Sequence, residues 1–164
     1  MTHFAWGGYT VEADVPATRD YYARAEDWGC ECGHCRNFVA LARERKLPEE
    51  LLAILDSASI PPEKATYVCE LYHEENWREK GLLYELSWRV AGTILDKPAG
   101  KDIGQDWGPV VELPWSNVML GHNDYPYGAP DFPQPHFDLE FTMYLPWVLE
   151  EHVDSPEKKK EDAP

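Results

Sequence analysis

The sequence predicts an α+β domain in which N-terminal helices pack on one face of a C-terminal, mainly antiparallel sheet. Apolar residues recur at helical spacing before residue 60 and alternate at strand spacing after residue 66. The sequence also lacks the regular strand–helix–strand order of parallel α/β folds. Its length of 164 residues and aromatic content of 13% fit one packed domain. We therefore expect one domain over residues 1–153 and a flexible charged tail over residues 154–164.

Three helices are expected in the first half of the chain. Thr18 is the expected N-cap of a short helix over residues 18–25, since its hydroxyl can accept from the first free N–H groups. Apolar residues three and four apart predict a second helix from Cys35 to residue 45. Pro48 suits the first turn of a third helix, which ends before Ile60-Pro61-Pro62 because proline breaks helices.

Two-residue alternation predicts four strands in the second half of the chain. Pro114 interrupts the third strand, which suits an edge or a bulge, and Gly92 marks a bend or bulge in the second. The last strand alternates most clearly, as expected for a strand with one buried face. A segment rich in Pro, Asp and Tyr over residues 122–135 is expected to be irregular. The strands are expected over residues 67–73, 82–94, 110–120 and 137–145.

The formal net charge of −15 comes from 30 acidic and 15 basic residues. A field of this sign repels phosphate backbones and anionic membranes, so neither nucleic acid nor a membrane is an expected partner. Another protein with a basic surface fits this charge better. The N-terminus lacks the features of a signal peptide, and no apolar run is long enough to span a bilayer. We therefore expect a cytoplasmic protein whose cysteines are reduced or metal-bound rather than disulfide-linked.

Three closely spaced cysteines, Cys30, Cys32 and Cys35, form the pattern that relates most directly to chemistry. Cys30 and Cys32 can point to the same side of an extended stretch, and Cys35 then lies near the start of a helix. Unpaired backbone N–H groups at a helix start favour the thiolate form, which is the form that binds metals. Three thiolates hold a tetrahedral zinc ion when a fourth ligand is supplied. The cluster therefore predicts a structural zinc site.

The fourth ligand has three candidates. Cys69 is the first, because we expect it on the apolar-facing side of its strand. His73 lies one pair further along the same strand face, and His34 is less suitable because its neighbours constrain it. The spacing matches none of the standard zinc-finger patterns, so other uses of the cysteines stay open. They can form a redox-active thiol pair or pack as small apolar side chains, whereas an iron–sulfur cluster requires a fourth thiolate.

Other motifs give weaker indications. Two His-x-Asp pairs can orient an imidazole for base or metal chemistry, and rings of the irregular segment can form a binding surface or fold back as a loop core. Three side chains near the cysteines are expected to support their loop by packing, by pairing with an acid and by capping. The sequence contains no signature of the common hydrolases or nucleotide enzymes. The residues concerned are His122 and Asp124, His136 and Asp138, Tyr125, Tyr127 and Phe132, and Trp28, Arg36 and Asn37.

The segment from Trp28 to Phe38 resembles a family of small, uncharacterised bacterial proteins marked by Cys-x-Cys-x-x-Cys-Arg-Asn-Phe. The likeness extends to Leu47-Pro48 and to Ile60-Pro61-Pro62, and it covers the first seventy residues of the chain. No activity, substrate or cofactor is established for this family. The resemblance therefore implies a bacterial intracellular protein and nothing further about its role.

The sequence as a whole favours a non-enzymatic, acidic intracellular binding domain with a structural zinc site. Its predicted ligands are Cys30, Cys32, Cys35 and Cys69. The alternative is a thiol redox protein, or a metal-dependent enzyme, that uses the same cysteine loop.

Overall fold

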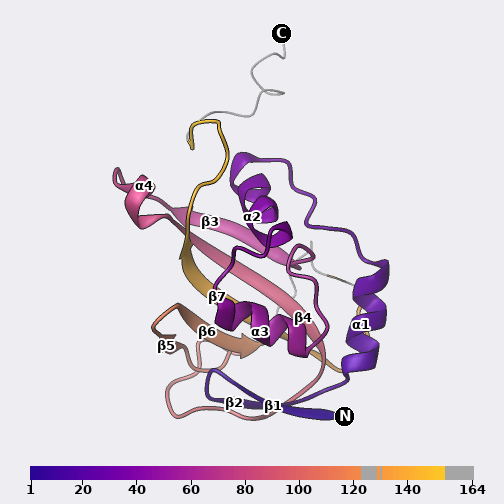
Figure 1. Ribbon diagram of the computed structural model, residues 1–164. Helices are drawn as coiled ribbons and strands as arrows, with labels where there is room; N and C mark the ends of the chain where they lie inside the picture. The colour runs from indigo at the N-terminus through magenta and orange to yellow at the C-terminus, as the bar shows by residue number, and fades with distance from the viewer. Residues whose placement is uncertain (123–128, 130, 154–164) are drawn as a thin grey trace.

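Helices cover one face of an antiparallel sheet in the computed structural model, which describes residues 1–122, 129 and 131–153 (Figure 1). Within these residues seven strands form one sheet with four accompanying helices, which confirms the predicted α+β class. No helix in this part of the chain has the length and apolar character needed to cross a bilayer. The predicted tail lies outside the described residues. The elements are β1 (Thr2–Trp6), β2 (Tyr9–Ala13), α1 (Val15–Arg24), α2 (Gly33–Arg43), α3 (Glu49–Ser57), β3 (Tyr67–Tyr72), α4 (Trp77–Lys80), β4 (Leu82–Asp96), β5 (Val111–Leu113), β6 (Ser116–Gly121) and β7 (His136–Leu145).

The long strand β4 is the centre of the sheet. The strand order is β1-β2-β4-β7-β6-β5, and β3 also pairs with β4. Along one edge of β4, β7 pairs with residues 82–91. Along the opposite edge, β3 pairs with residues 83–87 and β2 pairs with residues 92–96. A gap in the strand pairing therefore lies between β3 and β2 on this second edge.

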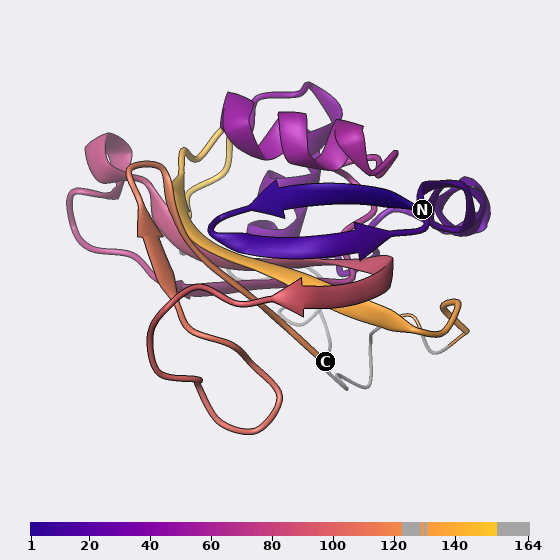
Figure 2. The ribbon, with the colours of Figure 1, turned by 90° about the horizontal axis from the view of Figure 1, so that it is seen from below.

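The helices α2 and α3 lie on one side of the sheet, as the view in Figure 2 shows. Phe38 of α2 packs against Trp88 of β4 with ring centroids 6.1 Å apart, and Trp88 packs against Phe141 of β7 at 6.0 Å. All three side chains are fully buried. Their contacts form the main apolar layer, since a helix and a sheet are stable together when each buries its apolar face on the other.

A β-hairpin precedes the helices, so the expectation that helices come first and strands follow is wrong. β1 and β2 pair as far as Trp6 opposite Tyr9. Gly7 and Gly8 connect them with φ values of 55° and 85°, which glycine adopts without strain in a two-residue turn. A Gly-Gly pair between short alternating runs is the sequence signal for such a hairpin.

Helix α1 begins at Val15, and its N-cap is Asp14 rather than Thr18. The Asp14 carboxylate accepts a hydrogen bond from the backbone N–H of Ala17 at 3.0 Å. Thr18 is fully buried, where its hydroxyl accepts from the backbone N–H of Ala91 at 3.1 Å. The helix therefore starts one turn earlier than predicted. The Thr18 hydroxyl accepts a hydrogen bond from a backbone N–H of β4 instead of capping the helix.

Three features of the second half differ from the expected strands. Residues 110–120 contain two strands, β5 and β6, because the chain turns at Pro114, which has no N–H for a ladder. Residues 76–81 include the short helix α4. β4 runs through Gly92 without a break, and a Cβ there would lie 2.0 Å from the carbonyl oxygen of Glu12. The glycine therefore permits the close approach of β2, and it lies where β4 stops pairing with β7 and begins to pair with β2.

Candidate metal centre

The sulfur atoms of Cys30, Cys32 and Cys35 all lie within 4.8 Å of one another. All four cysteines of the chain are free thiols. Cys30 is exposed, Cys32 is half-buried and Cys35 is buried, so the cluster extends from the surface into the domain. Three sulfur atoms at this separation can act together as ligands of one metal ion.

The local chain folds around the start of α2. Cys32 is the N-cap residue, and its carbonyl oxygen accepts from the backbone N–H of Arg36 at 2.9 Å. The Arg36 side chain also donates to the carbonyl oxygen of Glu31 at 2.9 Å and forms an ion pair with Glu151. On the other side of the cluster, the backbone N–H of Trp28 donates to the carbonyl oxygen of Glu63 at 2.9 Å. These bonds hold the cysteine segment from both ends.

Asn37 supports the cluster differently from the predicted cap. It is fully buried, and its amide donates to the carbonyl oxygen of Pro146 at 3.0 Å and to the hydroxyl of Tyr84 at 3.2 Å. Its own side-chain oxygen accepts from the backbone N–H of Val148 at 2.8 Å. Tyr84 then donates to the carbonyl oxygen of His34 at 2.7 Å. Asn37 therefore fixes α2 to β4 and to the segment after β7, which passes beside α2 in Figure 1.

The three thiols are unequal electrostatically. The thiol of Cys35 donates a hydrogen bond to the sulfur of Cys32 and, together with the backbone N–H of Cys35, lowers the pKa of Cys32 to about 5, although burial opposes this shift. The same bond to Cys32, and burial, raise the pKa of Cys35. In the metal-free cluster the negative charge therefore lies on Cys32.

Site-resolved alkylation tests this inequality. We expect iodoacetamide to modify Cys32 at a rate that levels off above about pH 6, because a thiol with a pKa of about 5 is then almost fully ionised. Cys35 should react slowest because it is buried and its pKa is raised. Peptide mapping of metal-free protein measures each rate, with half-buried Cys69 as the internal reference. A Cys32 rate that still rises tenfold per pH unit near neutrality would contradict the lowered pKa.

Two buried polar atoms near the cluster lack hydrogen-bond partners among the described residues. They are the indole Nε1 of Trp28 and the Nδ1 of His34. The Trp28 indole N–H opposes the raised pKa of Cys35, so it lies close to that sulfur atom. The charge of His34 is the weakest of the causes that lower the pKa of Cys32. A buried donor without an acceptor is costly, and a metal-bound thiolate is a stronger acceptor than a thiol. The surroundings of the cluster therefore fit a bound cation.

Cys69 lies outside the three-sulfur group. The expectation that it faces the apolar side of its strand is wrong, because Val68 is the buried residue of this pair and Cys69 lies opposite Glu85 on the other face. Cys69 lines a cavity of about 820 Å³ together with Trp28 and Cys30. Its role as the fourth ligand stays a prediction.

The two candidate histidines also lie outside the three-sulfur group, and both flank Glu70. The Nδ1 atom of His73 is 2.8 Å from one carboxylate oxygen of Glu70, and the Nε2 atom of His34 is 3.9 Å from the other. Glu70 therefore orients the His73 ring by a hydrogen bond, whereas its contact with His34 is too long for one. The structure brings together three of the four predicted ligands.

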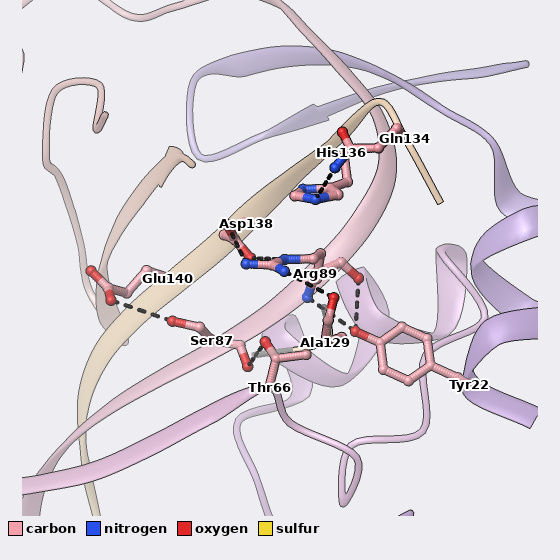
Figure 3. A network of polar contacts seen from close by, with 9 residues as sticks. All are labelled: Tyr22, Thr66, Ser87, Arg89, Ala129, Gln134, His136, Asp138 and Glu140. Carbon is pink, nitrogen blue, oxygen red and sulfur yellow. Dashed lines mark hydrogen bonds and ion pairs between the residues drawn. The ribbon is translucent and has the colours of Figure 1, made fainter. Parts of the chain in front are cut away.

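The described residues of the two His-x-Asp pairs do not form a His–Asp hydrogen bond of the kind found in a catalytic dyad. Asp138 forms a buried ion pair with Arg89, whose Nε is 2.8 Å from a carboxylate oxygen. The Gln134 amide donates to Nε2 of His136 at 2.9 Å, as Figure 3 shows. His122 is exposed, and Asp124 lies outside the described residues. Asp138 is therefore engaged by a guanidinium that the sequence pattern did not indicate.

Of the three rings named in the irregular segment, the structure describes Phe132. Phe132 is buried and packs against Tyr21 and Tyr22 of α1, with ring centroids 4.4 Å and 5.8 Å apart. This residue therefore belongs to a loop core rather than to a free binding surface. Tyr125 and Tyr127 lie outside the described residues.

A polar network on the second face of the sheet was missed by the sequence reasoning (Figure 3). Arg89 and Asp138 lie side by side on β4 and β7, and Ser87 on β4 donates to the Glu140 carboxylate at 3.3 Å. All four residues are buried, so the last strand has two buried faces at its centre and not one. Burial, and the neighbouring Glu85, raise the pKa of Glu140 to about 9. The signal in the sequence was the set of charged residues at alternate positions of two strongly apolar strands.

Comparison of the chain with protein-family models, curated proteins and solved structures gives no match. The resemblance carried by the motif from Trp28 to Phe38 therefore stays a prediction. The geometry of the cysteine cluster is the observation from which a function can be argued.

Proposed function

We propose that the protein is a non-enzymatic zinc-binding domain in which Cys30, Cys32 and Cys35 hold the ion. The observation that carries this proposal is the separation of the three sulfur atoms, all within 4.8 Å. Thiolates are soft ligands, and zinc accepts three of them with one further ligand in a tetrahedral site. The indole N–H of Trp28 beside the cluster supports the same conclusion, because it would stabilise a thiolate, which carries more charge than a thiol.

A bound zinc ion would link the exposed end of the cluster to the buried end. Cys30 belongs to the segment before α2, whereas Cys35 lies inside the first turn of the helix. Because an unfolded chain does not hold the three thiolates together, zinc binding would stabilise the folded state. We propose a structural role for this reason, in the reducing environment of the cytoplasm.

The proposed partner is another protein with a basic surface. The net charge of −15 gives the domain a field that attracts cations and steers basic surfaces toward it. The same field opposes binding to nucleic acid or to an anionic membrane. Association with such a partner should weaken as the salt concentration rises, because salt screens exposed charges.

Elemental analysis of protein purified without an affinity tag or a chelator tests the metal site. We expect about one zinc ion per chain, as one tetrahedral site requires. Replacing Cys30, Cys32 or Cys35 by Ser should lower the zinc affinity by more than the roughly 10- to 100-fold that losing a supporting hydrogen bond costs. Cys69→Ser is the matched variant outside the cluster. An unchanged affinity in Cys69→Ser excludes Cys69 as the fourth ligand, and wild-type protein without metal overturns the proposal.

Trp28→Phe tests the unpartnered indole separately. The variant keeps an aromatic ring and removes the N–H that faces the cluster, together with the smaller ring of the indole. We expect the zinc affinity to fall about 10- to 100-fold, as for the loss of a supporting hydrogen bond at a metal site. Competition with a chromophoric chelator measures this affinity. Trp115→Phe is the control, because Trp115 packs on Phe141 at the opposite part of the sheet. Equal affinities in both variants would show that the indole N–H does not support the ligands.

A further inference from the structure

Cys32 and Cys35 frame the first turn of α2. Cys32 is the N-cap residue, and only Gly33 and His34 separate it from Cys35. Their sulfur atoms lie within 4.8 Å of each other, with Cys32 half-buried and Cys35 buried behind it. A disulfide requires Cβ atoms about 3.5–4.5 Å apart, which is closer than the roughly 5–6 Å between residues three apart within a regular helix. Cys32 has a non-helical backbone with ψ of 159°, which allows its side chain to approach Cys35 more closely than that spacing.

We propose that Cys32 and Cys35 exchange thiol for disulfide with low-molecular-weight disulfides such as glutathione disulfide. This activity requires no metal, and it would be a second use of the cluster. Its consequence for zinc rests on the proposed function: the disulfide removes two of the three thiolates, so the disulfide form and the zinc-bound form exclude each other.

The exchange has two steps. The sulfur of Cys32 attacks one sulfur of glutathione disulfide, so a mixed disulfide forms and the first glutathione leaves as a thiolate. The sulfur of Cys35 then attacks that of Cys32, so the Cys32–Cys35 bond forms and the second glutathione leaves. The two protons of the protein thiols pass through solvent to the leaving thiolates. Two protein thiols are thus oxidised by two electrons, while one glutathione disulfide is reduced to two glutathione molecules.

The accessibility of the two sulfur atoms determines which of them attacks glutathione disulfide first. Cys32 is half-buried and adjoins the exposed N-terminal end of the helix, so a small disulfide can reach it. Cys35 is 5% exposed, so an external disulfide cannot reach it, and its accessible target is the sulfur of Cys32.

Cys30 is the competing partner for Cys32. The two residues are separated by Glu31 alone in a segment without helix or strand. In an extended chain, residues two apart have Cα atoms about 6.6–7.2 Å from each other, at or beyond the upper limit for an unstrained disulfide. We therefore expect the bond to form between Cys32 and Cys35 in preference to Cys30.

Redox titration of metal-free protein in buffers of graded glutathione to glutathione disulfide ratio tests the proposal. After quenching with an alkylating reagent, peptide mapping should show one Cys32–Cys35 disulfide, with Cys30 and Cys69 alkylated. Cys35→Ser should stop at the mixed disulfide between Cys32 and glutathione, whereas Cys69→Ser should behave as wild type. If Cys35→Ser does not fold, the wild-type map decides the question alone. A disulfide that contains Cys30, or four alkylated thiols at every ratio, overturns the inference.

Zinc content measured on the same preparation separates this inference from the proposed function. Protein that binds zinc but forms no Cys32–Cys35 disulfide supports the metal site and overturns the exchange activity. Protein that forms the disulfide but binds no zinc supports the exchange activity and overturns the metal site. If both hold, zinc-loaded protein should need a more oxidising ratio to form the disulfide, because bound zinc withdraws the two thiolates from reaction.

Discussion

Replacing Tyr22 by Phe is expected to lower the free energy of unfolding by about 3 kcal/mol, because two buried backbone groups lose their partner. The Tyr22 hydroxyl donates to the carbonyl oxygen of Arg89 at 2.7 Å and accepts from its backbone N–H at 3.0 Å. Arg89 lies in the gap between the positions where β3 and β2 pair with β4. The hydroxyl therefore takes the place of a neighbouring strand there (Figure 3).

The substitution isolates the hydroxyl because the ring contacts remain. Tyr22 packs on Tyr21 and Phe132 at centroid distances of 5.5 Å and 5.8 Å, and Phe preserves this packing. Tyr21→Phe is the matched control on the same helix, and we expect it to change stability by less than about 0.5 kcal/mol. Urea denaturation under reducing conditions measures both variants. A loss below about 1 kcal/mol in Tyr22→Phe would mean that the two backbone groups find other partners.

Glu140→Gln is expected to stabilise the protein in mildly alkaline solution. The carboxyl of Glu140 is 1% exposed, and its raised pKa of about 9 means that the folded protein keeps it protonated near neutral pH. The unfolded chain binds fewer protons at that pH, so the stability contributed by this group is full below about pH 4.5 and is lost as pH rises toward 9. Glutamine resembles the protonated carboxyl and does not ionise.

The expected gain is on the order of 3 kcal/mol at about pH 8, and it should disappear at about pH 4. The protonated carboxyl of Glu140 accepts a hydrogen bond from Ser87 and forms another with Glu85. A glutamine side chain can make both hydrogen bonds, because its amide accepts through oxygen and donates through nitrogen. Glu112→Gln makes the same chemical change at an exposed position of β5 and should have little effect at either pH. Denaturation curves across this pH range measure the difference. A gain that is equal at both pH values would contradict a raised pKa for Glu140.

Local patterns predicted much of the fold. The alternation from Phe137 to Leu145 identified β7, and the apolar periodicity after Cys35 identified α2. The closeness of Cys30, Cys32 and Cys35 could also be predicted, because it follows from their spacing before a helix. In each case the physical cause lies within a few residues of the chain.

The features that the sequence did not predict depend on distant contacts. Alternation in β3 separates Cys69 from Val68 but does not say which of them faces the helices. The burial of the Arg89–Asp138 pair involves the segment of Ala129 and Phe132, because the Ala129 carbonyl oxygen accepts from Arg89 and Phe132 packs on α1. The role of Tyr22 depends on the pairing of both β3 and β2 with one edge of β4. None of these long-range contacts is indicated by a periodicity or a motif in the sequence.

The central position of β4 has a consequence for how the chain folds. Its neighbours β2 and β7 are remote along the chain, as in the pairing of Thr10 with Asp96 and of Leu82 with Leu145, whereas β3 closely precedes β4. Contacts between remote residues slow folding, because long loops must close before any of these contacts forms. During synthesis, β4 has an unpaired apolar edge until residue 145 has left the ribosome. A chain that is released before that point would expose this edge to other chains and be prone to aggregate.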